Sequence, residues 1–321
     1  MGITAVVNQK GGVGKTTVTL GLAAAVSELG GRVLVVDMDP QANSTTGLGI
    51  WEATGTVDVA LATEEAGSIA AIVQSSSWPT PNGGVIDVVP SSPALAQREH
   101  QLATDVIGGH DRLAGALSGV VDKYDTVFID CPPSLGLLTV NALFAADDVL
   151  IVAEPAAWSA DGVDQILRNI ARIAERRSGR PTVTGIVINR LGRTRDGAHW
   201  YDQLRETHTS LVLEPPVRLR AAIAEASAHC LPITALTRSG ADESAEEFRK
   251  LIAVLHPSRF GESSPSPASV MGTSQGDLSD EMTITNSLTV PSAEDLDGSA
   301  RTLETPDGQV RPEATETNGW R

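Results

Sequence analysis

Residues 8–17 combine glycine, lysine and threonine in an order suited to binding phosphate. They read Asn-Gln-Lys-Gly-Gly-Val-Gly-Lys-Thr-Thr and lie between an apolar run at 3–7 and an Ala/Leu-rich stretch. Three residues without a Cβ let the chain fold tightly around an anion and point successive N–H groups at its oxygens: Gly11, Gly12 and Gly14. Lys15 would add a charge to the β- and γ-phosphates, and the Thr16 hydroxyl would ligate Mg²⁺. The segment predicts a nucleotide phosphate loop with ATP and Mg²⁺ as cofactors.

The loop departs from the standard phosphate-loop pattern at its start. That pattern, Gly-x-x-x-x-Gly-Lys-[Ser/Thr], places its first glycine at position 9, where this chain has Gln9 followed by Lys10. A second lysine therefore precedes the glycines.

With this second lysine the loop resembles the ParA/MinD family of deviant Walker A ATPases, whose signature Lys-Gly-Gly-x-Gly-Lys-Thr-Thr matches residues 10–17. The resemblance implies that Lys10 reaches the nucleotide of a partner subunit, so that two subunits enclose two ATP molecules in a homodimer. Lys10, Lys15 and Asp39 are then the expected catalytic residues. The ATP-binding residues expected in the loop are Lys10, Gly11, Gly12, Val13, Gly14, Lys15, Thr16 and Thr17.

Two aspartates follow a second apolar strand at 32–37. Asp37 is its last residue and Asp39 comes two places later. Carboxylates at the carboxyl end of a parallel strand lie on the sheet edge where α/β proteins bind ligands. The resemblance implies that Asp39 orients the attacking water and that Asp37 supports the magnesium shell. The alternative is ordinary turn chemistry.

A third strand ends in a Walker B segment. Residues 125–130 read Asp-Thr-Val-Phe-Ile-Asp, so Asp130 is expected to hold Mg²⁺ through its water shell, beside Thr16 and Asp37. Cys131, between the strand end and two prolines, is expected to pack rather than react.

Adenine recognition is assigned from the resemblance. Asn189 follows the apolar strand 182–188, where family members bind the purine through an asparagine. Pro216 follows the short strand 211–213, where they pack a proline on the base. Both could instead be ordinary strand-end residues. Cys230 replaces a family glycine, so the local loop is expected to differ if that glycine needs positive φ.

The elements that position these residues alternate along the chain. We expect strands at 3–8, 32–37, 86–89, 126–130, 148–153, 182–188 and 211–213, and helices near 15–29, 111–121, 136–145, 161–177, 218–228 and 241–255. This order predicts an α/β fold of the P-loop NTPase class, with a mainly parallel sheet covered by helices on both faces. One ATPase domain is expected over residues 1–256.

Residues 257–321 have a different composition. They are rich in Ser, Thr, Pro, Gly and acid, and carry 11 acidic residues against 4 arginines. Such a segment cannot offset its ordering entropy by burial, so we predict a disordered acidic tail, with a small poorly patterned domain as the alternative. The whole chain has a net charge of −16, of which −9 belongs to residues 1–256.

Several classes of protein are disfavoured. No apolar run approaches the roughly 20 residues of a spanning helix, and the basic start of a secretion signal is missing. The 2 cysteines and 6 histidines suggest neither a disulfide framework nor a zinc site. We expect a cytoplasmic, nucleoid-associated protein that does not bind membranes.

An acidic pI near 4.7 is opposite to the usual footprint of a DNA-binding protein. Screening over about 8 Å at physiological salt nevertheless lets a local basic patch act independently of distant acids. In ParA relatives, arginines from the C-terminal part of the ATPase domain bind the DNA backbone without reading bases. The matching candidates are Arg190, Arg193, Arg195, Arg218 and Arg220.

The resemblance favours a ParA-type ATPase for chromosome or plasmid partitioning. Its implied partners are nonspecific DNA and a ParB-type centromere-binding protein whose basic N-terminal segment stimulates hydrolysis. Two alternatives remain open: a related ATPase that positions a non-DNA cargo, and a MinD-like division-site protein. The MinD type requires a basic amphipathic C-terminal helix, whereas this chain ends in an acidic segment.

Overall fold

The computed structural model describes residues 2–157 and 159–261. Of the tail predicted at 257–321, residues 262–321 lie outside the described residues. Eight strands form one sheet in the order β3-β4-β2-β5-β1-β6-β7-β8. Every neighbouring pair is parallel except β3 with β4. The strands are β1 Ile3–Val7, β2 Arg32–Asp37, β3 Gln74–Ser75, β4 Val85–Val89, β5 Thr126–Asp130, β6 Asp148–Ala153, β7 Thr182–Ile188 and β8 Val212–Leu213. The predicted fold class is confirmed.

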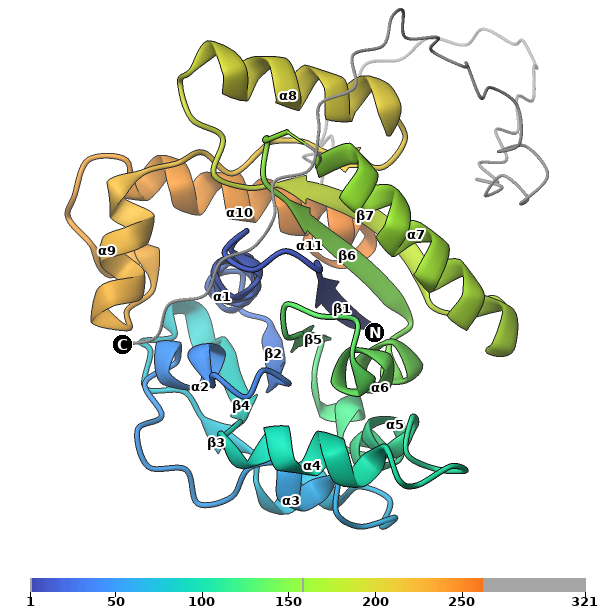
Figure 1. Cartoon of the computed structure of the whole chain (residues 1–321). Coiled ribbons are helices and arrows are strands. Elements are labelled where there is room, and N and C mark those ends of the chain that lie inside the picture. Colours follow the sequence, from blue (N-terminus) through green and yellow to red (C-terminus); the bar gives the residue numbers. More distant parts are fainter. Residues whose placement is uncertain (1, 158, 262–321) are drawn as a thin grey trace, which may run out of the picture. The chain divides into compact units, whose positions relative to one another are not determined.

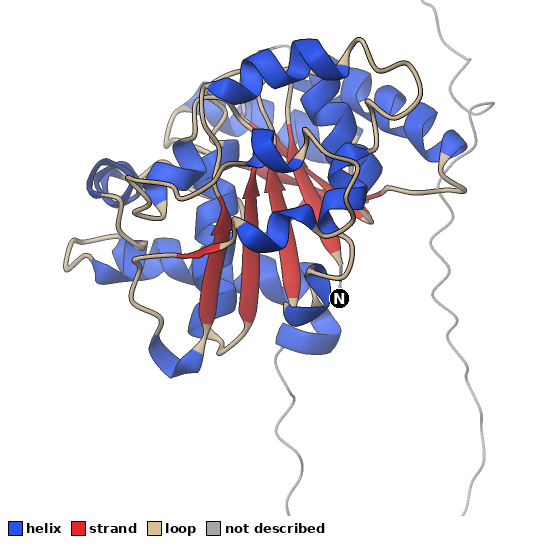
Figure 2. Cartoon of the chain, turned by 90° about the horizontal axis from the view of Figure 1, so that it is seen from below, coloured by secondary structure: helices blue, strands red, loops and turns tan. Residues whose placement is uncertain are grey.

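Helices cover both faces of this sheet (Figure 2). They are α1 Lys15–Glu28, α2 Asn43–Gly47, α3 Val57–Ala60, α4 Ala94–Leu102, α5 Arg112–Leu117, α6 Leu137–Ala145, α7 Ser159–Arg176, α8 Arg195–Thr207, α9 Ala221–His229, α10 Ala241–Leu255 and α11 Pro257–Phe260. Because successive residues of a strand face opposite ways, Val33 and Val35 pack towards α1 and α10, while Leu34 and Val36 pack towards the side of α4 to α7 (Figure 1).

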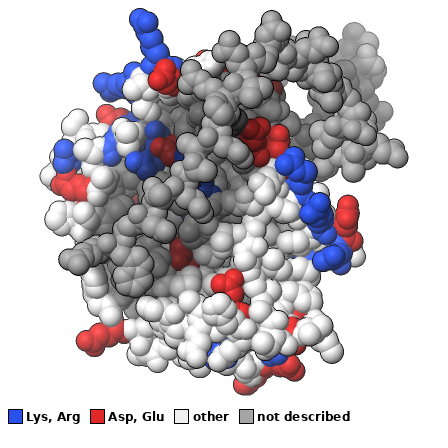
Figure 3. Space-filling view, viewed as in Figure 1, with Lys and Arg blue, Asp and Glu red and all other residues white. Residues whose placement is uncertain are grey.

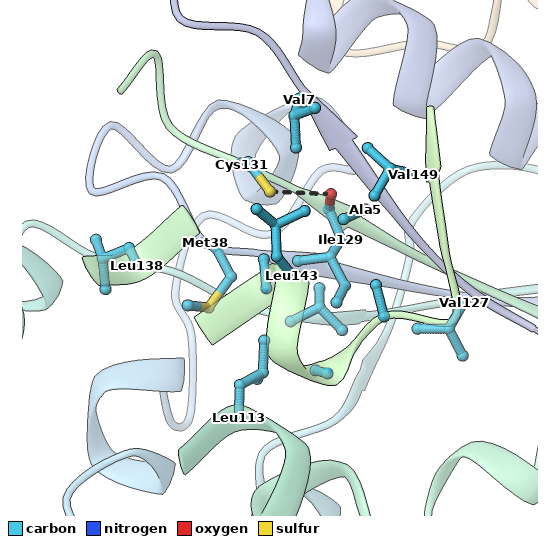
Figure 4. Close-up of a cluster of buried hydrophobic side chains, with 14 of the residues drawn as sticks. Ala5, Val7, Met38, Leu113, Val127, Ile129, Cys131, Leu138, Leu143 and Val149 are labelled. Atoms are coloured by element: carbon cyan, nitrogen blue, oxygen red, sulfur yellow. Dashed lines mark hydrogen bonds between the residues drawn. The ribbon is translucent and has the colours of Figure 1, made fainter. Parts of the chain in front are cut away.

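Cys131 belongs to the core on the α6 side of the sheet. Its side chain is 1% exposed and packs among buried residues of β1, β5 and α6. The thiol donates to the Ile129 carbonyl, with 3.7 Å between sulfur and oxygen (Figure 4). Burial raises the pKa of the Cys131 thiol, which keeps it protonated and unreactive, as expected of a packing residue.

Several elements differ from the sequence expectations. The structure adds β3, α2, α3, α4 and α8, none of which was expected. The residues of α2, Asn-Ser-Thr-Thr-Gly, and the start of α8, Arg-Asp-Gly, favour turns and loops by propensity, so tertiary contacts decide their conformation. The helix expected at 218–228 begins instead at Ala221, because Arg218 still pairs with Leu191 in a parallel bridge.

Cys230, which replaces a family glycine, lies at the C-terminal end of α9. Cys230 takes the left-handed conformation itself, with φ 52° at the C-terminal end of α9, and its carbonyl accepts from the Trp78 indole at 2.8 Å. Cysteine thus adopts a positive φ at this position, and the expectation of a loop that differs from that of family members stays a prediction. Helix α11 lies just beyond the predicted domain boundary at residue 256. None of the helices described is long and apolar enough to cross a membrane.

Candidate active site

The strand order brings the three predicted motifs to one edge of the sheet. β1, which leads into the phosphate loop, lies beside β5, and β5 lies beside β2. In this register Asp130 is paired with Val6 on one side and with Asp37 on the other. The two carboxylates therefore lie side by side where the phosphate loop begins.

The phosphate loop has the backbone that its glycines predict. Gly12 and Gly14 have φ values of 80° and 88°, which residues with a Cβ rarely adopt. Gly14 is the N-cap of α1 and makes no side-chain cap hydrogen bond, so the helix presents its amide groups and positive end to the loop. A Cβ on Gly14 would also lie 2.2 Å from the Asn189 side-chain nitrogen. Glycine is thus required at this position for two independent reasons.

Asp130 offers an oxygen site that fits magnesium. Its Oδ2 accepts from the hydroxyls of Thr16 and Ser44, both at 2.7 Å. Its Oδ1 is buried and has no hydrogen-bond partner within residues 2–157 and 159–261. Burial raises the pKa of Asp130 to about 6, and the hydroxyls and the charge of Lys15 oppose that rise. A buried carboxylate oxygen without a donor, beside a threonine hydroxyl, suits a hard cation.

Lys15 points its charge into this site from the first residue of α1. The residue is only 7% exposed. Burial lowers the pKa of Lys15, and the nearby charges of Asp130 and Asp39 oppose this decrease. A buried ammonium group at a helix N-terminus, close to carboxylates but in no ion pair with them within the described residues, can receive a phosphate.

Asp37 and Asp39 are held by short-range hydrogen bonds. Asp37 Oδ2 accepts from the Thr45 amide at 2.8 Å and from the Thr45 hydroxyl at 2.7 Å, and Oδ1 accepts from the Asp39 amide at 3.1 Å. Burial and the charge of Asp130 raise the pKa of Asp37 to about 7. Asp39 is 9% exposed, and its Oδ1 accepts from the Gln41 amide at 2.9 Å. Both carboxylates are therefore held in direction by donors of the protein itself.

Lys10 differs from Lys15 in its exposure and in its contacts. Its side chain is 59% exposed, and its ammonium lies 3.8 Å from Glu154 Oε2. Its backbone amide donates to the Asn8 side chain at 2.7 Å, which fixes the start of the loop without restraining the lysine side chain. An exposed ion pair of this kind contributes about 0–1 kcal/mol, so Lys10 can leave it at little cost.

The residues expected near adenine contact the loop itself. Asn189 is buried and donates its side-chain amide to the Val13 carbonyl at 2.7 Å. Arg190 has φ 60° and donates to the Gly12 carbonyl at 2.8 Å. Pro216 is buried just after β8. The adenine roles of Asn189 and Pro216 stay predictions, and so does the DNA role of Arg190, whose guanidinium faces the phosphate loop.

Three of the predicted arginines surround one hollow of about 600 Å³. Arg193, Arg218 and Arg220 line it together with the starts of α9 and α10 and with Glu243; we call it the arginine hollow. Figure 3 shows one group of basic side chains over the region of α8, α9 and α10 and another along α7. Arg195, the first residue of α8, is exposed and does not line the hollow.

The three arginines of the hollow are not equivalent. Arg193 and Arg218 are exposed and have no ion-pair partner in the described part of the chain. Arg220 instead forms two hydrogen bonds with Glu247, at 2.6 and 2.7 Å, and these bonds raise the pKa of its guanidinium. The same carboxylate accepts from the Arg218 amide at 3.1 Å. Arg220 is thus engaged within the fold, while Arg193 and Arg218 are available to a ligand.

Sequence reasoning missed three hydroxyl residues at the carboxylate end of the site. Ser44 and Thr45 are the second and third residues of α2 and donate to Asp130 and Asp37 respectively. Ser91 follows β4 and contacts both Thr45 and the Asp39 carbonyl. Ser44 and Thr45 could have been found from the sequence, because they are adjacent hydroxyl residues soon after the two aspartates. Ser91 gave no such signal, because its place depends on β4 lying beside β2.

A glycine loop between a strand and a helix, a buried lysine at its end and carboxylates on the neighbouring strands define a P-loop nucleotide-binding protein. Residues 1–182 match a family profile described as an AAA domain. The chain is 34% identical over 232 residues to the sporulation initiation inhibitor protein Soj of Bacillus subtilis, covering 72% of this chain and 89% of Soj. It is 38% identical over 199 residues to the chromosome partitioning protein ParA of Myxococcus xanthus, covering 61% and 68%. The chain belongs to the ParA/MinD-type family of P-loop ATPases.

Solved structures agree with the fold. The ATP complex of a single-residue variant of Cyanothece McdA superposes with a TM-score of 0.69 at 21% identity, covering 80% of this chain and 96% of McdA. A Mycobacterium smegmatis protein titled cobyrinic acid a,c-diamide synthase, solved with an ATP analogue and magnesium, gives a TM-score of 0.64 at 30% identity, covering 80% and 95%. Since such neighbours contain ATP, its analogue and magnesium, the predicted cofactors are confirmed at the level of the family.

Proposed function

We propose that this protein is a ParA-type partition ATPase that acts at the nucleoid. MgATP closes two subunits into a sandwich dimer, the dimer binds DNA without sequence preference, and hydrolysis releases it. The observation that carries the proposal is the contrast between the two lysines of the loop. Lys15 is buried among the carboxylates of its own site, whereas the Lys10 side chain is 59% exposed and weakly paired. One lysine serves its own nucleotide and the other is free to reach that of a partner.

The residues of the site divide the chemistry of hydrolysis among them. Lys15 and the loop amides hold the β- and γ-phosphates, while Thr16 and Asp130 would hold Mg²⁺ with support from Asp37. Bound there, Mg²⁺ would neutralise phosphate charge. Asp39 orients the attacking water from the neighbouring strand end. Lys10 of the partner stabilises the charge that develops on the transferring phosphoryl group.

The arginine hollow is the proposed contact with DNA. Arg193 and Arg218 present exposed guanidinium groups, and the same hollow is lined by Ala221 at the start of α9 and by Gly240 at the N-cap of α10. These groups bind phosphate oxygens and carry no base recognition, so binding is nonspecific. Arg195 extends the basic surface at the start of α8. A ParB-type protein with a basic N-terminal segment is the proposed stimulator of hydrolysis.

Fluorescence anisotropy with a random-sequence duplex tests this function. Full-length protein should bind the duplex with MgATP and release it with ADP. Arg218→Ala should weaken binding by about tenfold or more through loss of a phosphate contact. Arg180→Ala is the matched control, because it removes the same charge at the amino end of β7, where Arg180 pairs with Asp147. Equal binding with and without ATP, or equal losses in the two variants, would contradict the proposal.

A related ATPase that positions a protein cargo is the second candidate. The net charge of −16 favours it, because so acidic a chain is unusual for a DNA-binding protein. The nucleotide residues serve both functions equally. Absence of DNA binding in the presence of ATP, together with normal ATP-dependent dimerisation, would favour this candidate over partition.

A further inference from the structure

Ser91 connects β4 to the catalytic carboxylates. It follows the carboxyl end of β4, which lies beside β2, and it is 4% exposed. Its amide donates to the Thr45 hydroxyl at 2.9 Å, and its own hydroxyl donates to the Asp39 carbonyl at 2.7 Å. Ser91 thus contacts the backbone of the residue assigned to the attacking water.

Thr45 links Ser91 to the second aspartate, Asp37. Its hydroxyl accepts from Ser91 and donates to Asp37 Oδ2, while its amide donates to the same oxygen. Asp37 in turn accepts from the Asp39 amide. Ser91, Thr45, Asp37 and Asp39 therefore form a closed set of hydrogen bonds, which we call the hydroxyl network. All four residues are buried.

The network fixes Asp39 where regular secondary structure does not. Residues 38–42 form the connection between β2 and α2, and Ala42 at its end has φ 54°. Within this connection the Asp39 amide donates to Asp37, and the Asp39 carbonyl accepts from the Ser91 hydroxyl and from the Ala42 amide, the latter at 2.9 Å. With both ends of the residue held, its carboxylate has a fixed direction. No donor to Asp39 Oδ2 is found in the described part of the chain, which leaves that oxygen to a water.

The network also explains why polar side chains are buried at this point of the core. Thr45 is 3% exposed, and valine has the same shape without the hydroxyl. If packing were the role of this position, an apolar residue would serve. A buried hydroxyl that both donates and accepts instead sets the separation between two backbone segments.

We propose that Ser91 and Thr45 are positioning residues for the hydrolysis step. They hold Asp39 in the direction from which it orients the attacking water, and they do not contact the nucleotide. The proposal rests on the function proposed above, since it requires Asp39 to act on that water. A displacement of about 1 Å at a catalytic group lowers a rate by roughly a hundredfold, so losing the network should affect turnover before it affects binding.

The test compares full-length Ser91→Ala and Thr45→Val with two neighbours that also lose a hydroxyl. Thr46→Val is the control for Thr45, because the Thr46 hydroxyl bonds only to carbonyls at the start of α2. Ser92→Ala is the control for Ser91, because the Ser92 hydroxyl contacts Asp58. ATPase kcat and KM, the Kd of a fluorescent slowly hydrolysed ATP analogue and the thermal midpoint are measured for each protein.

We expect kcat to fall by about tenfold to a hundredfold in Ser91→Ala and Thr45→Val, while KM and the analogue Kd change by less than about twofold. Thr45→Ser, which keeps the hydroxyl, should restore most of the rate. The two controls should resemble the wild type. If Thr45→Val does not fold, Ser91→Ala alone decides, because it removes one hydroxyl and keeps the backbone amide bond to Thr45.

Two results would overturn the proposal: normal turnover in Ser91→Ala, or a loss of analogue binding as large as the loss of kcat. Asp39→Ala distinguishes this failure from failure of the proposed function. If Asp39→Ala is inactive while Ser91→Ala and Thr45→Val turn over normally, the network has no positioning role and the assignment of Asp39 stands. If Asp39→Ala hydrolyses ATP at the normal rate, the catalytic role of Asp39 is wrong and the positioning role fails with it.

Discussion

The nucleotide site and the arginine hollow use charge in opposite ways. At the nucleotide site Lys15, Asp37 and Asp130 are buried, and each carboxylate is directed by hydroxyl or amide donors. In the hollow Arg193 and Arg218 are exposed and unpaired within the described residues. Buried, fixed charges act at full strength on one geometry, whereas exposed charges act through a screened field on any arrangement of phosphates. The first region is suited to catalysis and the second to nonspecific binding.

Removing the buried lysine should have the largest effect of all. Lys15→Ala deletes the ammonium that faces the phosphates and leaves the carboxylates around it uncompensated. We expect binding of a fluorescent ATP analogue to fall below detection while the protein stays folded. Lys250→Ala is the control, because Lys250 is exposed on α10 and pairs only with Glu246. Normal analogue binding by Lys15→Ala would show that the buried charge does not hold the nucleotide.

Salt concentration should change the affinity for DNA and the affinity for nucleotide to very different extents. If the dimer neutralises about six or more phosphates, DNA affinity should fall by roughly a thousandfold between about 50 and 200 mM salt. Nucleotide affinity should change far less, because its contacts are buried. Parallel titrations of DNA and of the ATP analogue across this range measure both slopes. Similar slopes for the two ligands would contradict the proposed difference between the regions.

Lys10 tests whether an exposed charge can serve the nucleotide site. Lys10→Ala should keep nucleotide binding by the monomer and weaken ATP-dependent dimerisation by about tenfold to a hundredfold, the worth of a charge-assisted hydrogen bond. Sedimentation with a slowly hydrolysed analogue measures the dimer. Glu154→Gln is the control, because it releases Lys10 from its ion pair and should not weaken the dimer. A wild-type dimer in Lys10→Ala would remove the proposed action across the interface.

The difference between the regions also decides what the sequence could predict. Gly14, Lys15, Asp37 and Asp130 each belong to a contiguous motif at the end of a strand, and parallel strands bring their carboxyl ends to one edge. Three local motifs were therefore enough to place the phosphate loop and both carboxylates at the same edge of the sheet, but not to make their strands neighbours. The pairing of Asp37 with Asp130 follows from the register of β2 and β5.

Contacts between distant elements could not be predicted in this way. Ser91 reaches the site because β4 lies beside β2, and strand order is not written in a local pattern. The partner of Arg220, Glu247, lies 27 residues away on α10, and its direction depends on how that helix packs. An arginine that binds DNA and one that holds a helix look alike in sequence. Only burial and partners distinguish Arg220 from Arg218.

The smallest expected effect is on protein stability, and it tests the difference between Arg220 and Arg218. Arg220→Ala leaves the Glu247 carboxylate, 9% exposed, without its two guanidinium donors. An uncompensated, largely buried charge of this kind should lower the free energy of unfolding by about 1–3 kcal/mol. Arg218→Ala should change it by less than about 0.5 kcal/mol, since its guanidinium is exposed. Urea denaturation of the two variants compares them directly, and equal stabilities would mean that Arg220 is as available to DNA as Arg218.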